Sequence, residues 1–163
     1  MPDDEDDEAR LGKQVTGAPP DWRARALDVV RILTVAFVLH WVWEATHAVA
    51  FVESSGTLWF RVWHCLPMAV TDAGWTVVLW LIVGGLSTSP RRAGLWRLAA
   101  LGVVGAVTAV VLEVVAVSSG RWTYNDVMPL LPVIDVGLWP VLQMGILPVL
   151  TVRLSDWWKP QLV

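Results

Sequence analysis

Four long apolar stretches dominate this sequence and limit the folds that the chain can adopt. They cover residues 27–52, 63–86, 95–117 and 131–154, and each reaches the roughly twenty residues that an α-helix needs to cross the hydrocarbon core of a membrane. Because that core supplies no water to hydrogen-bond an open backbone, such stretches adopt helices. The sequence therefore predicts an all-α protein, a four-helix transmembrane bundle that occupies residues 23–158.

The ends of the chain differ in composition from these stretches. Six of the fifteen acidic residues lie between Asp3 and Glu8, and a Pro-containing segment follows. A segment with so little apolar surface cannot fold by burying it, so we expect residues 1–22 to form a disordered tail. The acidic start also differs from a cleavable signal, which begins with a basic region. Residues 159–163 are expected to form a second short tail.

The lysines and arginines predict the orientation, because these residues favour the cytoplasmic side of membrane proteins. Ten of the twelve precede or open the first span, lie around the connection between the second and third spans, or lie at or after the end of the fourth: Arg10, Lys13, Arg23, Arg25, Arg31, Arg91, Arg92, Arg97, Arg153 and Lys159. Arg61 and Arg121 fall on the opposite side. Both termini are therefore expected in the cytoplasm, with the bundle in the plasma membrane as a multi-pass protein. The basic residues form no single patch, so we expect no nucleic-acid partner.

Each predicted span carries an acidic residue, and these four residues are the main indication of function. They are Glu44, Asp72, Glu113 and Asp135. A charged group at the centre of a membrane helix costs about 2.5–3.5 kcal/mol, so it persists mainly where it faces the interior and has a role. At about 1.5 Å per residue, all four fall in the outer half of the bilayer, with Asp135 nearest to the interface.

Helical spacing places polar residues of the first two spans on shared faces. His40, Glu44 and His47 are four and three positions apart, and so form one stripe. His64 shares a row with Asp72 in the same way. We therefore expect both rows to face the interior of the bundle.

The third and fourth spans have comparable rows. Trp139 and Gln143 continue the row of Asp135. Glu113 continues a stripe of small residues, of the kind that lets membrane helices pack closely. These small residues are Gly102, Ala106 and Ala109. Glu113 is therefore expected to point into the bundle.

Together these rows predict a polar cavity in the outer half of the membrane. The residues predicted to carry its chemistry are Glu44, Asp72 and Glu113, and those predicted to line it are His40, His47, His64, Trp75, Trp122, Tyr124, Asp135, Trp139 and Gln143. The alternative is that these side chains only join helices. Such contacts contribute about 0.6 kcal/mol on average, which is little for several buried carboxylates.

The segment 120–126 connects the third and fourth spans and contains Trp122 and Tyr124 among turn-forming residues. Such a segment can anchor the chain at the membrane interface, where amphipathic aromatic residues concentrate. Its position next to the acidic residues also predicts a lid over the cavity.

Glu44 and His47 have the Glu-x-x-His spacing of di-iron bundles, but the chain has no second copy of that motif. His40, Glu44 and His47 are the candidate metal ligands, yet three residues on one helix cannot by themselves close around an ion. Haem between His64 and a histidine of the first span is favoured even less. We therefore predict no metal ion and no other cofactor.

Part of the chain resembles a widespread group of small, uncharacterised bacterial membrane proteins with four spans. The residues that carry this resemblance are Trp43-Glu44, Asp72, Glu113, Arg121-Trp-x-Tyr124, Met128-Pro129 and Gly137-Leu-x-Pro140-x-Leu-Gln143. They cover most of residues 40–150, so the resemblance implies the four-span fold and no particular chemistry.

Two local motifs are also similar to integral-membrane isoprenoid enzymes. Trp43-Glu44 is similar to a pair in small membrane terpene cyclases, and Glu113 followed by Trp122-x-Tyr124 is similar to a region of membrane lycopene cyclases. In these enzymes a carboxylic acid protonates an alkene or epoxide and aromatic rings shelter the carbocation. The chain has fewer spans than these enzymes and lacks the paired glutamates of the lycopene cyclases.

Three hypotheses follow for function. The first is a membrane protein that binds or acts on a hydrophobic, isoprenoid- or lipid-like molecule; as an isomerase or cyclase it would use Glu44 as general acid, Asp72 or Glu113 as its partner and Gln143 to position groups. The second is a proton-relay or transport component, for which an oligomer could supply a pore. The third is a non-catalytic assembly subunit of a membrane complex.

Overall fold

The computed structural model describes residues 22–53, 56–85 and 93–158. The predicted tails therefore lie outside the described residues, apart from Trp22. Within the described residues the elements, in chain order, are α2 (Trp22–His47), a 3-10 turn (Ala48–Ala50), α3 (Leu58–His64), α4 (Leu66–Gly85), α5 (Ala93–Ser118), β1 (Leu130–Leu131), β2 (Val136–Gly137) and α6 (Leu138–Trp157).

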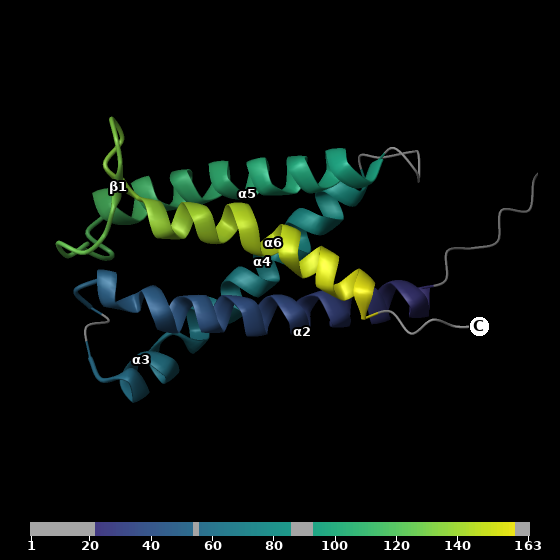
Figure 1. The fold of residues 1–163 in the computed structure, drawn as a ribbon, viewed down its shortest axis with the longest axis horizontal. Coiled ribbons are helices and arrows are strands. Elements are labelled where there is room, and N and C mark those ends of the chain that lie inside the picture. The colour runs from purple at the N-terminus through teal and green to yellow at the C-terminus, as the bar shows by residue number, and fades with distance from the viewer. Residues whose placement is uncertain (1–21, 54–55, 86–92, 159–163) are drawn as a thin grey trace, which may run out of the picture.

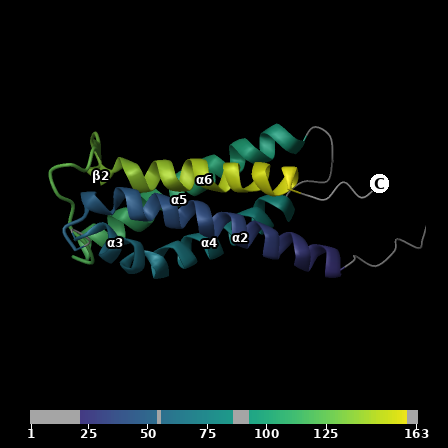
Figure 2. The same cartoon turned by 60° about the horizontal axis from the view of Figure 1, so that its bottom comes forward.

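Four of these helices, α2, α4, α5 and α6, are long and apolar enough to cross a membrane. The predicted number of spans is thus confirmed within the described residues, and the chain is a helical membrane protein by length and composition. The four helices run side by side, α5 against α6 and α2 against both α4 and α6 (Figure 1). The second view shows the same elongated bundle (Figure 2).

The two ends of the bundle differ. One end, here called the loop end, holds α3 and the connection from α5 to α6 (Figure 1). The other, here called the termini end, holds the start of α2 and the last turn of α6. It also holds the C-terminal end of α4 and the N-terminal end of α5.

Two glycines let α5 and α6 pack closely. A Cβ atom at Gly105 would lie 2.0 Å from the carbonyl oxygen of Met144, and one at Gly102 would lie 2.9 Å from that of Gly145. Conversely, a Cβ at Gly145 would lie 3.5 Å from the Ala106 Cβ. The small-residue stripe of the third span therefore does face a neighbouring helix, as its spacing predicted.

The second predicted span, 63–86, begins three residues too early. Trp63 and His64 belong to the separate short helix α3, and α4 begins at Leu66. The reason is Pro67, which has no N–H to continue the hydrogen bonding of α3 but suits the first turn of a new helix.

The fourth predicted span, 131–154, also starts in the wrong place. Residues 130–137 instead contain the short antiparallel pair β1–β2, in which Leu130 faces Gly137 and Leu131 faces Val136. The turn between the strands has positive φ angles at Val133 (79°) and Asp135 (50°), which a helix does not accommodate. Asp135 therefore lies exposed in a connection, outside the membrane span that was predicted to hold it.

Candidate functional site

A cavity of about 400 Å³ lies near the loop end, lined by residues of α2, α4, α5 and α6. Eight charged, histidine or amide side chains line it: Glu44, His47, Glu53, His64, Asp72, Glu113, Arg121 and Gln143. Much of the remaining lining is apolar, including Ala48, Phe51, Met68, Leu112 and Met144. The cavity therefore combines a hydrophobic wall with a compact polar wall.

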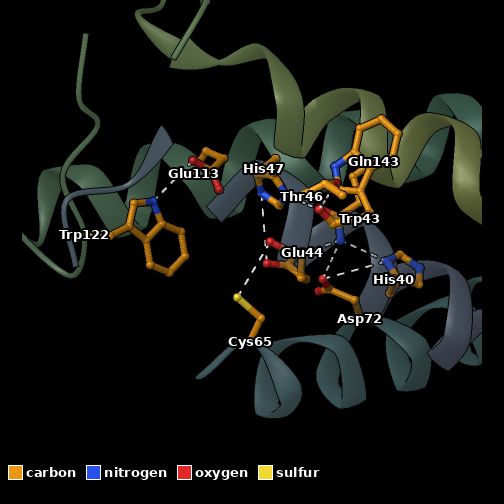
Figure 3. Close-up of polar contacts among 10 residues, drawn as sticks. All are labelled: His40, Trp43, Glu44, Thr46, His47, Cys65, Asp72, Glu113, Trp122 and Gln143. Atoms are coloured by element: carbon orange, nitrogen blue, oxygen red, sulfur yellow. Dashed lines mark hydrogen bonds and ion pairs between the residues drawn. The ribbon is translucent and has the colours of Figure 1, made fainter. Parts of the chain in front are cut away.

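Gln143 of α6 joins the acidic residues of α2 and α4. Its Nε2 atom donates to Oε1 of Glu44 (2.8 Å) and to Oδ2 of Asp72 (3.0 Å), and lies 3.0 Å from Nδ1 of His40. Figure 3 shows the four side chains converging from three helices. An amide nitrogen carries two hydrogens, so three acceptors compete for them.

His40 supports Gln143 from the side away from the cavity. Its Nε2 atom lies 3.0 Å from Oγ1 of Thr76, and both residues are fully buried. A ring that donates through Nε2 to Thr76 presents Nδ1 to Gln143 as an acceptor. The Nδ1 atom is also 3.8 Å from Oδ2 of Asp72. In this tautomer Nδ1 carries no hydrogen for the carboxylate, so His40 positions the Gln143 amide.

His47 lies beside Glu44 on the cavity wall. Its Nδ1–H donates to the carbonyl oxygen of Trp43 over 2.9 Å. In the neutral ring the Nε2 atom is then free of hydrogen, and it lies 4.0 Å from Oε2 of Glu44. The Nε2 lone pair therefore faces Glu44, at a separation longer than a hydrogen bond.

Glu113 of α5 belongs to a second polar group. Its Oε2 atom accepts hydrogen bonds from Nε1 of Trp122 (3.3 Å) and from the hydroxyl of Tyr124. That hydroxyl also accepts from the Gly137 N–H over 3.0 Å. Burial, and then the bond to Glu113, raise the pKa of Tyr124 above its usual range. In Figure 3, His47 lies between this group and the Gln143 cluster.

The segment that carries Trp122 and Tyr124 is tied to the end of α2. Tyr124 forms an antiparallel bridge with Phe51, and the Asn125 N–H donates to the carbonyl oxygen of Ala50 over 3.0 Å. The Phe51 ring packs edge-on against Trp122, with ring centroids 6.2 Å apart. The segment expected to form a lid thus closes over the 3-10 turn, and its tryptophan lines the cavity.

Most of the residues predicted to line a site come together. Glu44, Asp72, His47, Glu113, Gln143, Trp122 and His64 line the cavity, while His40 and Tyr124 contact residues that do. His64 lies exposed, with its ring stacked on Phe60 at 5.0 Å between centroids.

Three predicted residues lie elsewhere. Asp135 is in the exposed turn between β1 and β2. Trp75 is 38% exposed and, like Trp139, is not among the residues that line the cavity. Trp139 instead packs edge-on against Trp43, with centroids 6.4 Å apart. In the described part of the chain, no three His, Cys, Asp or Glu side chains are grouped as a metal site, so His40, Glu44 and His47 do not converge on an ion.

Several residues at the site were missed, among them Glu53 and Arg121, which line the cavity. Thr76 holds His40, and its spacing of four from Asp72 was the signal that could have found it. Cys65 lines the cavity, and its thiol donates to the Glu44 carbonyl oxygen over 3.6 Å. Burial raises the pKa of Cys65 to about 11, so it is a protonated, weakly reactive thiol near neutral pH.

Comparison of the chain with protein-family models, curated proteins and solved structures finds no match.

Proposed function

We propose that this membrane protein binds a hydrophobic, isoprenoid- or lipid-like molecule in the loop-end cavity and donates a proton to it from Glu44. The observation that carries the proposal is the Gln143 amide, which holds Glu44 and Asp72 together in the wall of a largely apolar cavity. A volume of about 400 Å³ falls within the range of small-molecule sites, roughly 300–1,000 Å³, which share this combination of apolar walls and few polar groups.

The way into the cavity supports a lipid-like ligand. Met68 of α4 and Leu112 of α5 both line the cavity, yet they are 47% and 53% exposed. Side chains that face both the cavity and the outer surface of two spanning helices border an opening toward the hydrocarbon core. A hydrophobic molecule would enter between α4 and α5 without passing through water.

Glu44 is the proton donor in this proposal. Gln143 can supply two hydrogens to three acceptors, so the cluster is one hydrogen short. A proton on Glu44 that is donated toward Asp72 would supply the missing hydrogen. Transfer of that proton to an alkene or epoxide leaves the Glu44 carboxylate, which Gln143 already solvates. The carboxylate would take a proton back from the product cation, as an isomerase or cyclase requires.

Aromatic rings support a cationic intermediate. Phe51 and Trp122 line the same cavity and pack against each other. The face of an aromatic ring attracts a cation within about 6 Å of its centre. The cationic intermediate would then lose a proton to Glu44 or Glu113. The reaction as a whole therefore neither consumes nor releases protons.

The orientation belongs to the same proposal. At the loop end lie Arg61 and Arg121, whereas the termini end carries more of the described arginines: Arg23, Arg25, Arg31, Arg97 and Arg153. This distribution favours both termini in the cytoplasm, with the protein in the plasma membrane. The cavity would then open to the outer leaflet.

Blocking the opening tests binding. We expect mass spectrometry to identify a hydrophobic molecule retained by the wild-type protein after purification in mild detergent. Leu112→Trp should lose it, because the larger ring fills the cavity between α4 and α5. Val111→Trp is the matched control, since Val111 is equally exposed and does not line the cavity. Equal retention by all three proteins would contradict the proposal.

A proton relay is the second candidate, favoured by one observation. The contact between His40 and Thr76 extends the polar cluster away from the cavity, toward the termini end. However, buried Leu79 and Leu147 lie farther along α4 and α6. Reconstitution in vesicles with a pH gradient separates the candidates, because a relay transfers protons across the membrane and a closed binding site does not.

A further inference from the structure

A second cavity, of about 610 Å³, lies at the termini end of the bundle. Five charged side chains line it: Asp28, Arg31, Arg97, Arg153 and Asp156. Its apolar lining includes Ile32, Val83 and Leu101. The exposed tryptophans near this end, Trp22, Trp96 and Trp157, are residues that concentrate at the level of lipid headgroups. The cavity is therefore at the depth of the headgroups, with an apolar inner surface.

The charges in this cavity favour an anion. Three guanidinium groups face two carboxylates, and one carboxylate, Asp28, is already paired with Arg31 over 2.9 Å on the same helix. Arg97 of α5 donates through Nη2 to the carbonyl oxygen of Gly84 over 3.1 Å. This bond fixes the guanidinium across the ends of α4 and α5. Guanidinium groups bind phosphate oxygens with two parallel hydrogen bonds, which makes arginine well suited to phosphate.

Ser155 supplies an independent indication of a polar ligand. It lines the cavity, is only 3% exposed, and its Oγ atom has no hydrogen-bond partner within the described part of the chain. A buried hydroxyl is normally hydrogen-bonded. The hydroxyl of a helical serine can bond the carbonyl oxygen four residues earlier, and the Ser155 side chain does not do so. It is therefore available to donate to a ligand in the cavity.

We propose that the termini-end cavity binds the phosphate group of an anionic phospholipid. Arg153 and Arg97 would bind the phosphate oxygens and Ser155 would donate a further hydrogen bond. The volume exceeds what a free phosphate ion needs, and the apolar surface of Ile32 and Leu101 suits the first carbons of acyl chains. This site is separate from the loop-end cavity and does not depend on the function proposed for it.

The test uses the full-length protein in detergent micelles. Native mass spectrometry would compare binding of phosphatidylglycerol, phosphatidylcholine and inorganic phosphate. Phosphatidylglycerol is expected to bind tightest, because it has the single negative charge and the acyl chains that the cavity fits. Equal binding of phosphatidylcholine, or binding of inorganic phosphate as strongly as phosphatidylglycerol, would overturn the proposal.

Variants place the binding in this cavity. Arg153→Gln and Ser155→Ala should each weaken phosphatidylglycerol binding, by about tenfold for the arginine, because a hydrogen bond from a charged donor is lost. Arg25→Gln is the control, since Arg25 is exposed near the same end and does not line the cavity. Ser155→Ala removes one oxygen atom from a helix, so it keeps the test valid if Arg153→Gln does not fold. Equal binding by both variants and the control would contradict the site.

Discussion

Gln143 on α6 donates a 2.8 Å hydrogen bond to Glu44 on α2, although 99 positions separate the two residues in the chain. The same amide reaches Asp72 on α4. One neutral side chain thus joins three spanning helices around two carboxyl groups. The packing of these three helices and the arrangement of the two carboxyl groups therefore share this amide.

Replacing the amide should destabilise the bundle. Gln143→Leu leaves Glu44, Asp72 and His40 without their shared donor, so we expect the free energy of unfolding to fall by about 1–3 kcal/mol. Denaturant unfolding in detergent measures this. In an Asp72→Asn background the loss should be smaller, because the new amide can donate to Glu44. Equal losses in the two backgrounds would show that the three helices are not joined through this cluster.

Substitution of Glu44 tests the proposed proton donor. Glu44→Gln keeps the size of the side chain but removes its acidic proton, so the variant should insert into the membrane normally and lose proton transfer. With the protein in heavy water, mass spectrometry should detect deuterium in the retained hydrophobic molecule for the wild type and none for Glu44→Gln. Glu53→Gln, an exposed glutamate that also lines the cavity, should behave as wild type. Undiminished deuterium in Glu44→Gln would assign the donor elsewhere.

Close packing of α5 and α6 predicts a sharp difference between two glycines. Gly105→Ala would place a methyl group 2.0 Å from the Met144 carbonyl oxygen, and overpacking of this kind typically costs about 1–3 kcal/mol. At Gly74, in α4, an added Cβ meets nothing within 4 Å. Gly74→Ala should therefore leave thermal stability unchanged or slightly higher, because alanine favours helices. Similar melting temperatures for the two variants would contradict the packing described.

Tyr124 allows a direct measurement of pH dependence, because it is the only tyrosine in the chain. Its pKa is raised above 10.0 by burial and by the bond to Glu113, so tyrosinate absorbance should appear at a higher pH than in the unfolded protein. Above pH 10 the unfolded chain loses this proton while the folded one keeps it. The contribution of Tyr124 to stability is thus full below pH 10 and is lost as the pH rises further.

The Glu113→Gln variant separates the two causes of the Tyr124 shift. Removing the carboxylate should lower the tyrosinate midpoint toward, but not to, the unfolded value, because burial remains and is the larger cause. A midpoint at the unfolded value in the wild-type protein would show that Tyr124 is exposed to solvent.

Cys65 should react slowly with thiol reagents. With a pKa of about 11, against an ordinary value of 9.0, it carries about a hundredfold less thiolate near neutral pH, and the thiolate is the reactive form. Maleimide labelling can be compared with Thr57→Cys in a Cys65→Ser background, since Thr57 is exposed. Equally fast labelling of the two proteins would contradict the buried position of Cys65.

The spans could be predicted from sequence because length and hydropathy alone define a membrane helix. Residues on one face, such as His40 and Glu44, could likewise be grouped from helical spacing. The rotation of each helix about its axis could not, because it depends on packing against neighbours. Asp72 therefore meets Gln143, while Glu113 forms a separate group with Tyr124.

The termini-end cavity was not predicted for a related reason. Arg97 and Arg153 have the positions expected of residues that orient a membrane protein, so their sequence gives no sign that they line a common cavity. Ser155 gave no signal either, because a serine near a helix end is usually exposed or capping. Only the assembled helices bring these side chains together.

The bridge between Phe51 and Tyr124 affects the route by which a molecule reaches the loop-end cavity. It closes the segment over the end of α2, so that in the proposed function molecules exchange sideways with the hydrocarbon core. Occupancy then depends on the mole fraction of the molecule in the bilayer and is independent of its solubility in water. Diluting the vesicles with buffer should leave the cavity filled, whereas diluting the bilayer with inert lipid should empty it.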